Sequence, residues 1–162
     1  MSLDLYLVSK QKREQVGTGV FIREGGKTKE LQTIEEVRAH FPDMDTSEIE
    51  ERVYETTYLF DENITHNLGN MAEHVPCNEG KNTLYHLLWR PDEHDFNVVT
   101  EQYRLYVAEC FRYMLIHRKE LEQYNPKNGW GSFESLYNYT LKLAEALQRW
   151  DGKEEVEIYA SR

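Results

Sequence analysis

The chain is predicted to change from strand to helix at residues 63–68, which read Asn63-Ile64-Thr65-His66-Asn67-Leu68. The apolar and aromatic run 58–60 before this stretch is typical of a strand. After it, apolar residues recur at helical spacings of three, four and seven, at Leu68, Met71, Ala72 and Val75. Thr65 is well placed as the helix N-cap, because its hydroxyl can accept a hydrogen bond from a free N–H group of the first turn.

Polar side chains gather at this junction. On a helical wheel, His66 and Asn70 point away from the apolar stripe, and Asn67 lies at its edge. Asn63, Thr65, His66 and Asn67 would therefore lie beside the positive end of a helix, which suits an anion or a carbonyl oxygen. The alternative is that the Asn and Thr residues are ordinary caps and that His66 is a solvated first-turn side chain.

Composition predicts a folded protein with a single core. The chain has 162 residues, 40% of them hydrophobic and 12% aromatic. Its net charge of −10 is spread along the chain, which argues against direct nucleic-acid binding because phosphate contacts need clustered Lys and Arg. No signal peptide is visible, and no apolar run approaches the roughly 20 residues that span a bilayer. We therefore expect a cytoplasmic protein without a membrane partner.

The Cys and His residues predict neither a metal site nor a cofactor. Cys77 and Cys110 have no metal spacing and give no disulfide framework, and Cys110 is expected in the core. The His and acidic residues at 86–94 do not have the spacing of a standard zinc or iron site. No nucleophile–base pair and no Gly-rich phosphate loop is visible, so the catalytic residues of any enzyme stay unknown.

Three strand-like segments, at about 3–8, 53–60 and 155–159, predict one small, mainly antiparallel sheet in which the first and last strands pair. About four helices are expected to pack on one face of this sheet, starting near Thr65, Asn82, Thr100 and Ser132. The helix from Thr100 to about Tyr124 is apolar over much of its circumference and is expected to be packed on several sides. The predicted fold class is therefore α+β.

Residues 10–51 are interpreted as an excursion between two core strands. The segment contains a short strand at 19–23, a Gly-Gly turn at 25–26, and two capping boxes at 33–36 and 47–50. It holds too few apolar residues to stand alone, so residues 1–162 are expected to form a single domain.

The second distinctive stretch is 125–132, which reads Asn-Pro-Lys-Asn-Gly-Trp-Gly-Ser. Glycines on both sides of Trp130 allow backbone conformations that other residues rarely adopt. Ser132 is expected to cap the helix that follows. Trp130 could stack on a flat ligand or could plug the core, and the loop taken in isolation favours the plug.

Several segments of the chain resemble a family of small, uncharacterised proteins of bacteriophages and prophages: Met1–Leu7, Asn63–Leu68 with Met71-Ala72, Leu88–Pro91, Asn125–Gly131 and Val156–Ile158. Shorter members of that family pass from the first strand almost directly to the Asn-Ile-Thr-His-Asn stretch, which agrees with an excursion at 10–51. The resemblance implies a cytoplasmic protein of the infected host cell. It implies no settled activity.

Three functions stay open. The first is binding of a small anionic, nucleotide-like ligand, with sequestration of a host signalling molecule. Trp130 would stack on the base, Arg90 would pair with phosphate, and Asn63 or Asn67 would fix the orientation. The full set of candidate ligand-binding residues is Asn63, Thr65, His66, Asn67, Arg90, Asn128 and Trp130.

The second function is an acidic inhibitor that binds a host protein or mimics nucleic acid. The third is an enzyme that uses His66 as general acid or base. Arg90 is expected to contribute to the same surface as His66 and not to a separate salt bridge. If the polar groups of the three stretches line one pocket, the ligand hypotheses gain; if they are scattered, the interaction hypothesis does. The ligand, any reaction and the oligomeric state cannot be assigned from the sequence.

Overall fold

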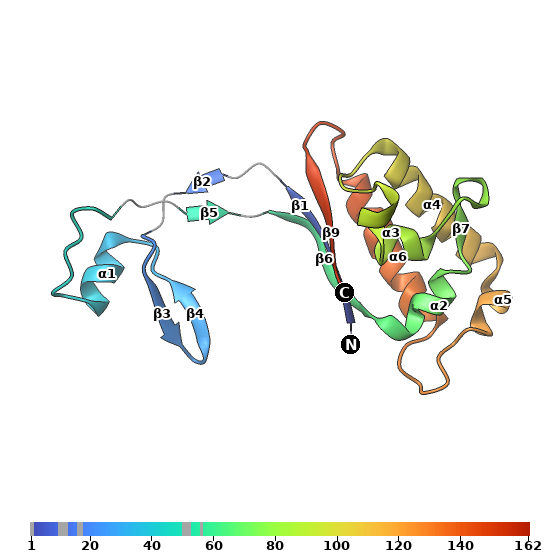
Figure 1. Cartoon of the computed structure of the whole chain (residues 1–162), viewed down its shortest axis with the longest axis horizontal. Coiled ribbons are helices and arrows are strands. Elements are labelled where there is room, and N and C mark those ends of the chain that lie inside the picture. Colours follow the sequence, from blue (N-terminus) through green and yellow to red (C-terminus); the bar gives the residue numbers. More distant parts are fainter. Residues whose placement is uncertain (1, 10–12, 16–17, 50–52, 56) are drawn as a thin grey trace. The chain divides into compact units, whose positions relative to one another are not determined.

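The computed structural model describes residues 2–9, 13–15, 18–49, 53–55 and 57–162. The helices are α1 (Ile34–His40), α2 (Gly69–Ala72), α3 (Leu84–Leu88), α4 (Glu101–Ile116), α5 (Arg118–Glu122) and α6 (Phe133–Gln148) (Figure 1). The strands are β1 (Ser2–Ser9), β2 (Arg13–Gln15), β3 (Phe21–Glu24), β4 (Lys27–Glu30), β5 (Val53–Glu55), β6 (Tyr58–Thr65), β7 (Pro76–Cys77), β8 (Asn82–Thr83) and β9 (Val156–Ser161). The chain divides into two compact units, one of Met1–Lys10 with Tyr58–Arg162 and one of Gln11–Thr57.

The larger unit is built on a three-stranded antiparallel sheet with the strand order β6-β1-β9. The central strand β1 places Leu5 opposite Glu62 of β6 and opposite Ala160 of β9. The helices of this unit lie on one side of the sheet (Figure 1). The α+β class is confirmed, and the first and last strands are paired as predicted.

Strand β1 explains why the sheet has two different faces. Leu3, Leu5 and Leu7 are fully buried, whereas Asp4 and Tyr6 between them are half-buried. Alternate side chains of a strand point to opposite faces, so the inner face is apolar and meets the helices. The outer face is polar and aromatic.

The second of the three predicted strands was placed too early in the chain. It is β6, Tyr58–Thr65, whereas Val53–Glu55 forms β5 and pairs with β2. The predicted change from strand to helix within 63–68 is confirmed, because β6 ends at Thr65 and a 3₁₀ turn begins at His66. Asn63 and Thr65 lie on the outer sheet face, where polar residues are tolerated, and a local pattern cannot distinguish such a strand from a loop.

The helix after Thr65 is shorter than predicted. Thr65 does cap it, but the cap begins a 3₁₀ turn at His66–Leu68 that leads into the four-residue helix α2. The predicted apolar stripe is buried, at Leu68, Met71, Ala72 and Val75. The next helix, α3, begins at Leu84 with Thr83 as its N-cap, so the predicted start at Asn82 was early by a short strand.

Helices α4 and α6 pack against each other and supply much of the core. Thr100 and Ser132 precede them as predicted, and the Thr100 hydroxyl accepts the Tyr103 N–H at 3.0 Å. Helix α4 ends at Ile116, and α5 follows after His117, so the single helix to Tyr124 was wrong. Three apolar residues of α4 are exposed, at Leu105, Leu115 and Ile116, so this helix is buried on one face and not on several sides.

The smaller unit contains the hairpin β3–β4 and the helix α1. The hairpin turns at Gly25 and Gly26, and Thr33 caps α1 by accepting the Glu36 N–H, both as predicted. Leu31 and Val37 are buried apolar residues of this unit. The second predicted capping box reaches Glu50, which lies outside the described residues. The unit corresponds to the predicted excursion at 10–51, and the single-domain interpretation stays a prediction.

Candidate functional site

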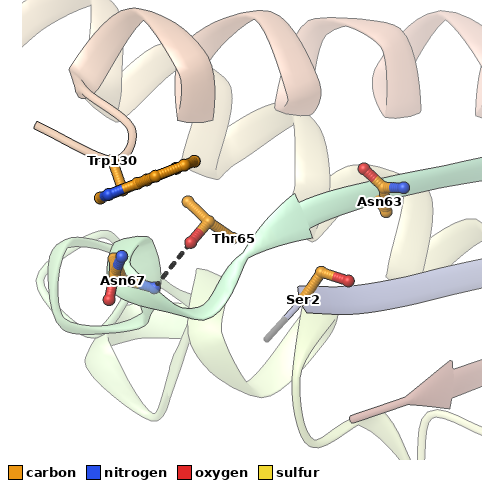
Figure 2. Close-up of a pocket in the computed structure, with 5 residues that line it drawn as sticks. All are labelled: Ser2, Asn63, Thr65, Asn67 and Trp130. Carbon is orange, nitrogen blue, oxygen red and sulfur yellow. Dashed lines mark hydrogen bonds between the residues drawn. The ribbon is translucent and has the colours of Figure 1, made fainter.

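A hollow of about 540 Å³ lies where one end of the outer sheet face meets the loop before α6 (Figure 2). It is lined by Ser2, Asn63, Thr65, Asn67 and Trp130. Ser2 and Thr65 lie directly opposite each other on β1 and β6, so the sheet register brings these distant residues together. The volume lies within the roughly 300–1,000 Å³ of small-molecule sites.

The loop holds Trp130 in an exposed position. The side chain is 71% exposed, so the prediction that it plugs the core is wrong. Gly131 has φ +95°, and a Cβ atom there would lie 2.9 Å from Thr65 Cγ2 and 3.1 Å from Leu68 Cδ1. Only glycine allows the loop to approach Thr65 and Leu68 this closely. The backbone N–H of Trp130 also donates to Asn128 Oδ1 at 3.0 Å, so Asn128 fixes the loop without lining the hollow.

The lining offers hydrogen-bonding groups to a ligand. Thr65 Oγ1 accepts the Asn67 N–H at 3.4 Å, which is drawn in Figure 2 and confirms the predicted cap. The side chains of Asn63 and Asn67 are exposed, and their amides have no partner among the described residues. Each amide supplies a carbonyl acceptor next to an NH₂ donor.

His66 makes a structural contact away from this lining. Its Nδ1 accepts a hydrogen bond from Trp89 Nε1 at 2.9 Å. Trp89 is only 2% exposed and stacks on Tyr85, with ring centroids 5.5 Å apart. An indole N–H can only donate, so Nδ1 of His66 carries no proton and the neutral ring holds its hydrogen on Nε2. His66 is therefore neither a solvated first-turn residue nor part of the hollow.

Arg90 also lies outside the lining. Its Nη1 pairs with Glu93 Oε1 at 3.2 Å, and its Nε donates to Tyr85 Oη at 3.4 Å. The hydrogen bond to Tyr85 raises the pKa of Arg90. Contrary to the prediction, Arg90 forms a salt bridge, because an acidic residue three positions along the chain takes the guanidinium. Arg90 does not line the hollow, and a surface that it shares with His66 stays a prediction.

Arg162 makes contacts with Trp89 and Asp92 that the sequence did not predict. Its Nη1 donates to the Trp89 carbonyl at 3.0 Å, and its guanidinium makes a two-point contact with Asp92 at 2.7 and 3.2 Å. This bond lowers the pKa of Asp92. Arg162 thus ties β9 to the end of α3. Seventy-odd positions separate it from its partners, so no local pattern signals the contact.

The site is electrically neutral. The described side chains that line the hollow are hydroxyls, amides and an indole, none of which carries a formal charge. A neighbouring depression of about 280 Å³ shares Asn63 and Thr65 and includes Lys142, whose Nζ lies 3.9 Å from Glu62 Oε1. Phosphates in proteins are held mainly by charged hydrogen bonds from Arg or Lys. The hollow itself therefore suits an uncharged ligand.

Two of the three predicted stretches converge at the hollow. The 63–67 junction contributes Asn63, Thr65 and Asn67, and the glycine-flanked loop contributes Trp130. The third stretch, around Arg90, does not contribute to it.

The described ranges contain no cluster of three or more His, Cys, Asp or Glu side chains that could hold a metal ion. Cys77 and Cys110 are buried thiols, and a hydrogen bond to Cys77 together with burial raises the pKa of Cys110. Within the same described ranges, no helix is long and apolar enough to cross a membrane.

No protein-family model matches this chain, and comparisons with curated proteins and with solved structures gave no match either.

Proposed function

We propose that the hollow beside Trp130 binds a small, uncharged ligand with a flat polar ring, of the nucleobase or nucleoside kind. The observation that carries this proposal is the display of Trp130. Its large indole is 71% exposed, and Gly131 and Asn128 fix it beside a polar lining. Stacking of a base on an aromatic side chain contributes roughly 1–3 kcal/mol.

The amides of Asn63 and Asn67 give this ligand an orientation. An Asn side chain presents a donor beside an acceptor, which is complementary to the paired acceptor and donor on the edge of a base. The hydroxyls of Ser2 and Thr65 lie at the end of the sheet and can bond a further polar substituent. The ring face and the ring edge are thus recognised by different elements of the fold.

A terminal phosphate is not part of the proposed ligand. The described lining has no cation, Arg90 is paired with Glu93, and the whole chain carries a net charge of −10. The sequence predicts a nucleotide-like ligand, and the neutral lining favours only the uncharged part of a nucleotide, its base or nucleoside. In the phage setting that the resemblance implies, the protein would withdraw such a base or nucleoside from the host cytoplasm. Binding alone is proposed, because no described side chain of the lining is a general acid or base.

The test is a titration with common ribonucleosides and their 5′-monophosphates, followed by tryptophan fluorescence and calorimetry. Of the three tryptophans, only Trp130 is exposed, so ring stacking should quench its emission. We expect at least one nucleoside to bind, and its 5′-monophosphate to bind no more tightly. Trp130→Ala should abolish the quench, and Asn63→Ala should weaken binding by about tenfold, the loss of roughly one hydrogen bond.

The matched control is Asn70→Ala, which removes an exposed amide on α2 outside the lining and should leave the affinity unchanged. The proposal fails if no nucleoside binds, or if Trp130→Ala binds as the wild type does.

A further inference from the structure

The outer face of the three-stranded sheet carries a second surface with a different chemistry. The register places Tyr6 of β1 opposite Asp61 of β6 and opposite Tyr159 of β9. Side chains directly opposite in a sheet lie on the same face. The outer face therefore consists of Ser2, Asp4, Tyr6, Val8, Tyr58, Asp61, Asn63, Thr65, Glu157, Tyr159 and Ser161. None of these described residues is a Lys or an Arg.

Three tyrosines form a continuous aromatic surface across this face. The Tyr6 ring centroid lies 5.8 Å from that of Tyr58 and 6.0 Å from that of Tyr159. Tyr58 is 50% exposed and Tyr159 is 60% exposed, so the two outer rings are open to solvent. Each strand of the sheet contributes one of the three rings.

Two carboxylates flank the central ring. Asp61 lies opposite Tyr6 on β6, and Asp4 lies two positions before Tyr6 on β1, so both share its face. Burial raises the pKa of Tyr6, and the negative charges of Asp4 and Asp61 raise it further. Asp4 is half-buried and Asp61 is exposed. Among the described residues, neither makes a hydrogen bond or an ion pair.

This combination is complementary to Arg and Lys side chains. A guanidinium or ammonium group is attracted to the face of an aromatic ring, and Arg can also contact a carboxylate at two points. A second copy of this chain would place the same negative charges against the face. Nucleic acid would bring phosphates to it. Both are repelled, whereas the net charge of −10 attracts a basic segment over a longer range.

We propose that this tyrosine–carboxylate face, formed by Asp4, Tyr6, Tyr58, Asp61 and Tyr159, docks an Arg- or Lys-rich segment of a partner protein. Basic side chains stack on the tyrosines and pair with the two aspartates. The inference goes beyond ligand binding at Trp130 and does not require a ligand there.

The charge part is tested by fluorescence anisotropy with a labelled octa-arginine peptide at low ionic strength. Asp4→Asn/Asp61→Asn removes two carboxylates from the face. Glu24→Gln/Glu79→Gln removes two exposed carboxylates away from the face and gives the same net charge. The aspartate variant should bind about five- to tenfold more weakly, as expected for two exposed ion pairs, and the glutamate variant should bind nearly as the wild type. Equal losses in the two variants would overturn the proposal, because they would show diffuse attraction to an acidic chain.

The aromatic part is tested with Tyr58→Thr/Tyr159→Thr. Threonine keeps a high strand propensity, so thermal unfolding should confirm that the sheet is intact. Peptide binding should weaken by roughly threefold at unchanged charge, from the loss of exposed cation–π contacts. Unchanged affinity would overturn the docking geometry.

The location of the bound peptide is tested by iodination of the tyrosines in the wild type, followed by mass spectrometry. Tyr58 and Tyr159 should be modified in the free protein and protected by octa-arginine. If they are already protected in the free protein, another part of the chain covers the face and the proposal is wrong.

Discussion

Trp89 and Trp130 lie on either side of the 65–67 turn and differ in almost every respect. Trp89 is buried, stacked on Tyr85, and bonded through its indole N–H to His66. Trp130 is exposed, and its indole N–H has no partner among the described residues. Thr65 and Asn67 face the exposed ring, whereas His66 between them contacts the buried one. Neighbouring polar residues at one turn can therefore belong to a binding hollow and to a structural cluster.

The largest expected difference is in stability. Trp89→Ala removes a buried ring and should lower the free energy of unfolding by about 3–5 kcal/mol. Trp130→Ala removes an exposed ring and should change it by less than about 0.5 kcal/mol. Urea denaturation of both variants gives the two values. Similar losses in the two variants would show that Trp130 supports the fold after all.

The next effect concerns the two glycines that flank Trp130. Both have positive φ, +78° at Gly129 and +95° at Gly131, but only at Gly131 would an added Cβ meet neighbouring atoms. Gly129→Ala should lower the free energy of unfolding by about 1–2 kcal/mol, from the left-handed backbone alone. Gly131→Ala should cost about 1 kcal/mol more, from crowding against Thr65 and Leu68, and should displace the indole, so nucleoside affinity should also fall. Equal effects of the two substitutions would contradict the close approach of loop and strand.

His66 should matter to stability and not to binding. His66→Ala leaves the buried Trp89 indole N–H without an acceptor, which costs about 1–3 kcal/mol. Asn67→Ala should leave stability nearly unchanged and weaken ligand binding. Thermal melts and titrations of both variants check this reversal. Weaker binding by a fully folded His66→Ala protein would return His66 to the binding site.

The smallest effect is a pH dependence of stability, which arises at His86 in α3 and not in the hollow. Burial, and then the stacked His94 ring at 3.9 Å, lower the pKa of His86 from its ordinary value of 6.5. Below pH 6.5 the unfolded chain therefore binds a proton that the folded chain does not. The free energy of unfolding should fall as the pH drops from 6.5 through the lower pKa of folded His86.

His86→Gln should flatten that part of the stability profile. The described lining of the hollow has no group that titrates near neutral pH, so nucleoside affinity should be constant from about pH 7.5 to about pH 5.5. If the nucleoside affinity changed with pH as the stability does, the hollow beside Trp130 would not be independent of the buried cluster around Trp89.

Local patterns predicted the elements but not their partners. The caps at Thr65, Thr100 and Ser132 could be identified because a hydroxyl bonds N–H groups only two or three residues away. The position of Asn63 and Thr65 on the outer sheet face could not be predicted, because polar residues suit both a loop and an exposed sheet face. The exposure of Trp130 depends on the contact of Gly131 with Thr65, sixty-odd residues earlier in the chain.

The same limit explains the misplaced candidates. Arg90 was assigned to phosphate from its position at a helix end, but Glu93 and Tyr85 on the same segment take its guanidinium. His66 was placed correctly off the apolar stripe, yet its true partner is an indole on another helix turn. A helical wheel shows which way a side chain points and not what lies there.

The most direct test of the account is an NMR titration that follows the indole N–H signals of the three tryptophans. Two of these groups donate hydrogen bonds within the protein, Trp89 to His66 at 2.9 Å and Trp150 to the Glu154 carbonyl at 2.7 Å. Addition of the tightest-binding nucleoside should shift the Trp130 signal and leave the other two in place. A shift at Trp89 without one at Trp130 would place the ligand beside the buried cluster of His66, Tyr85 and Trp89 and would contradict the proposed function.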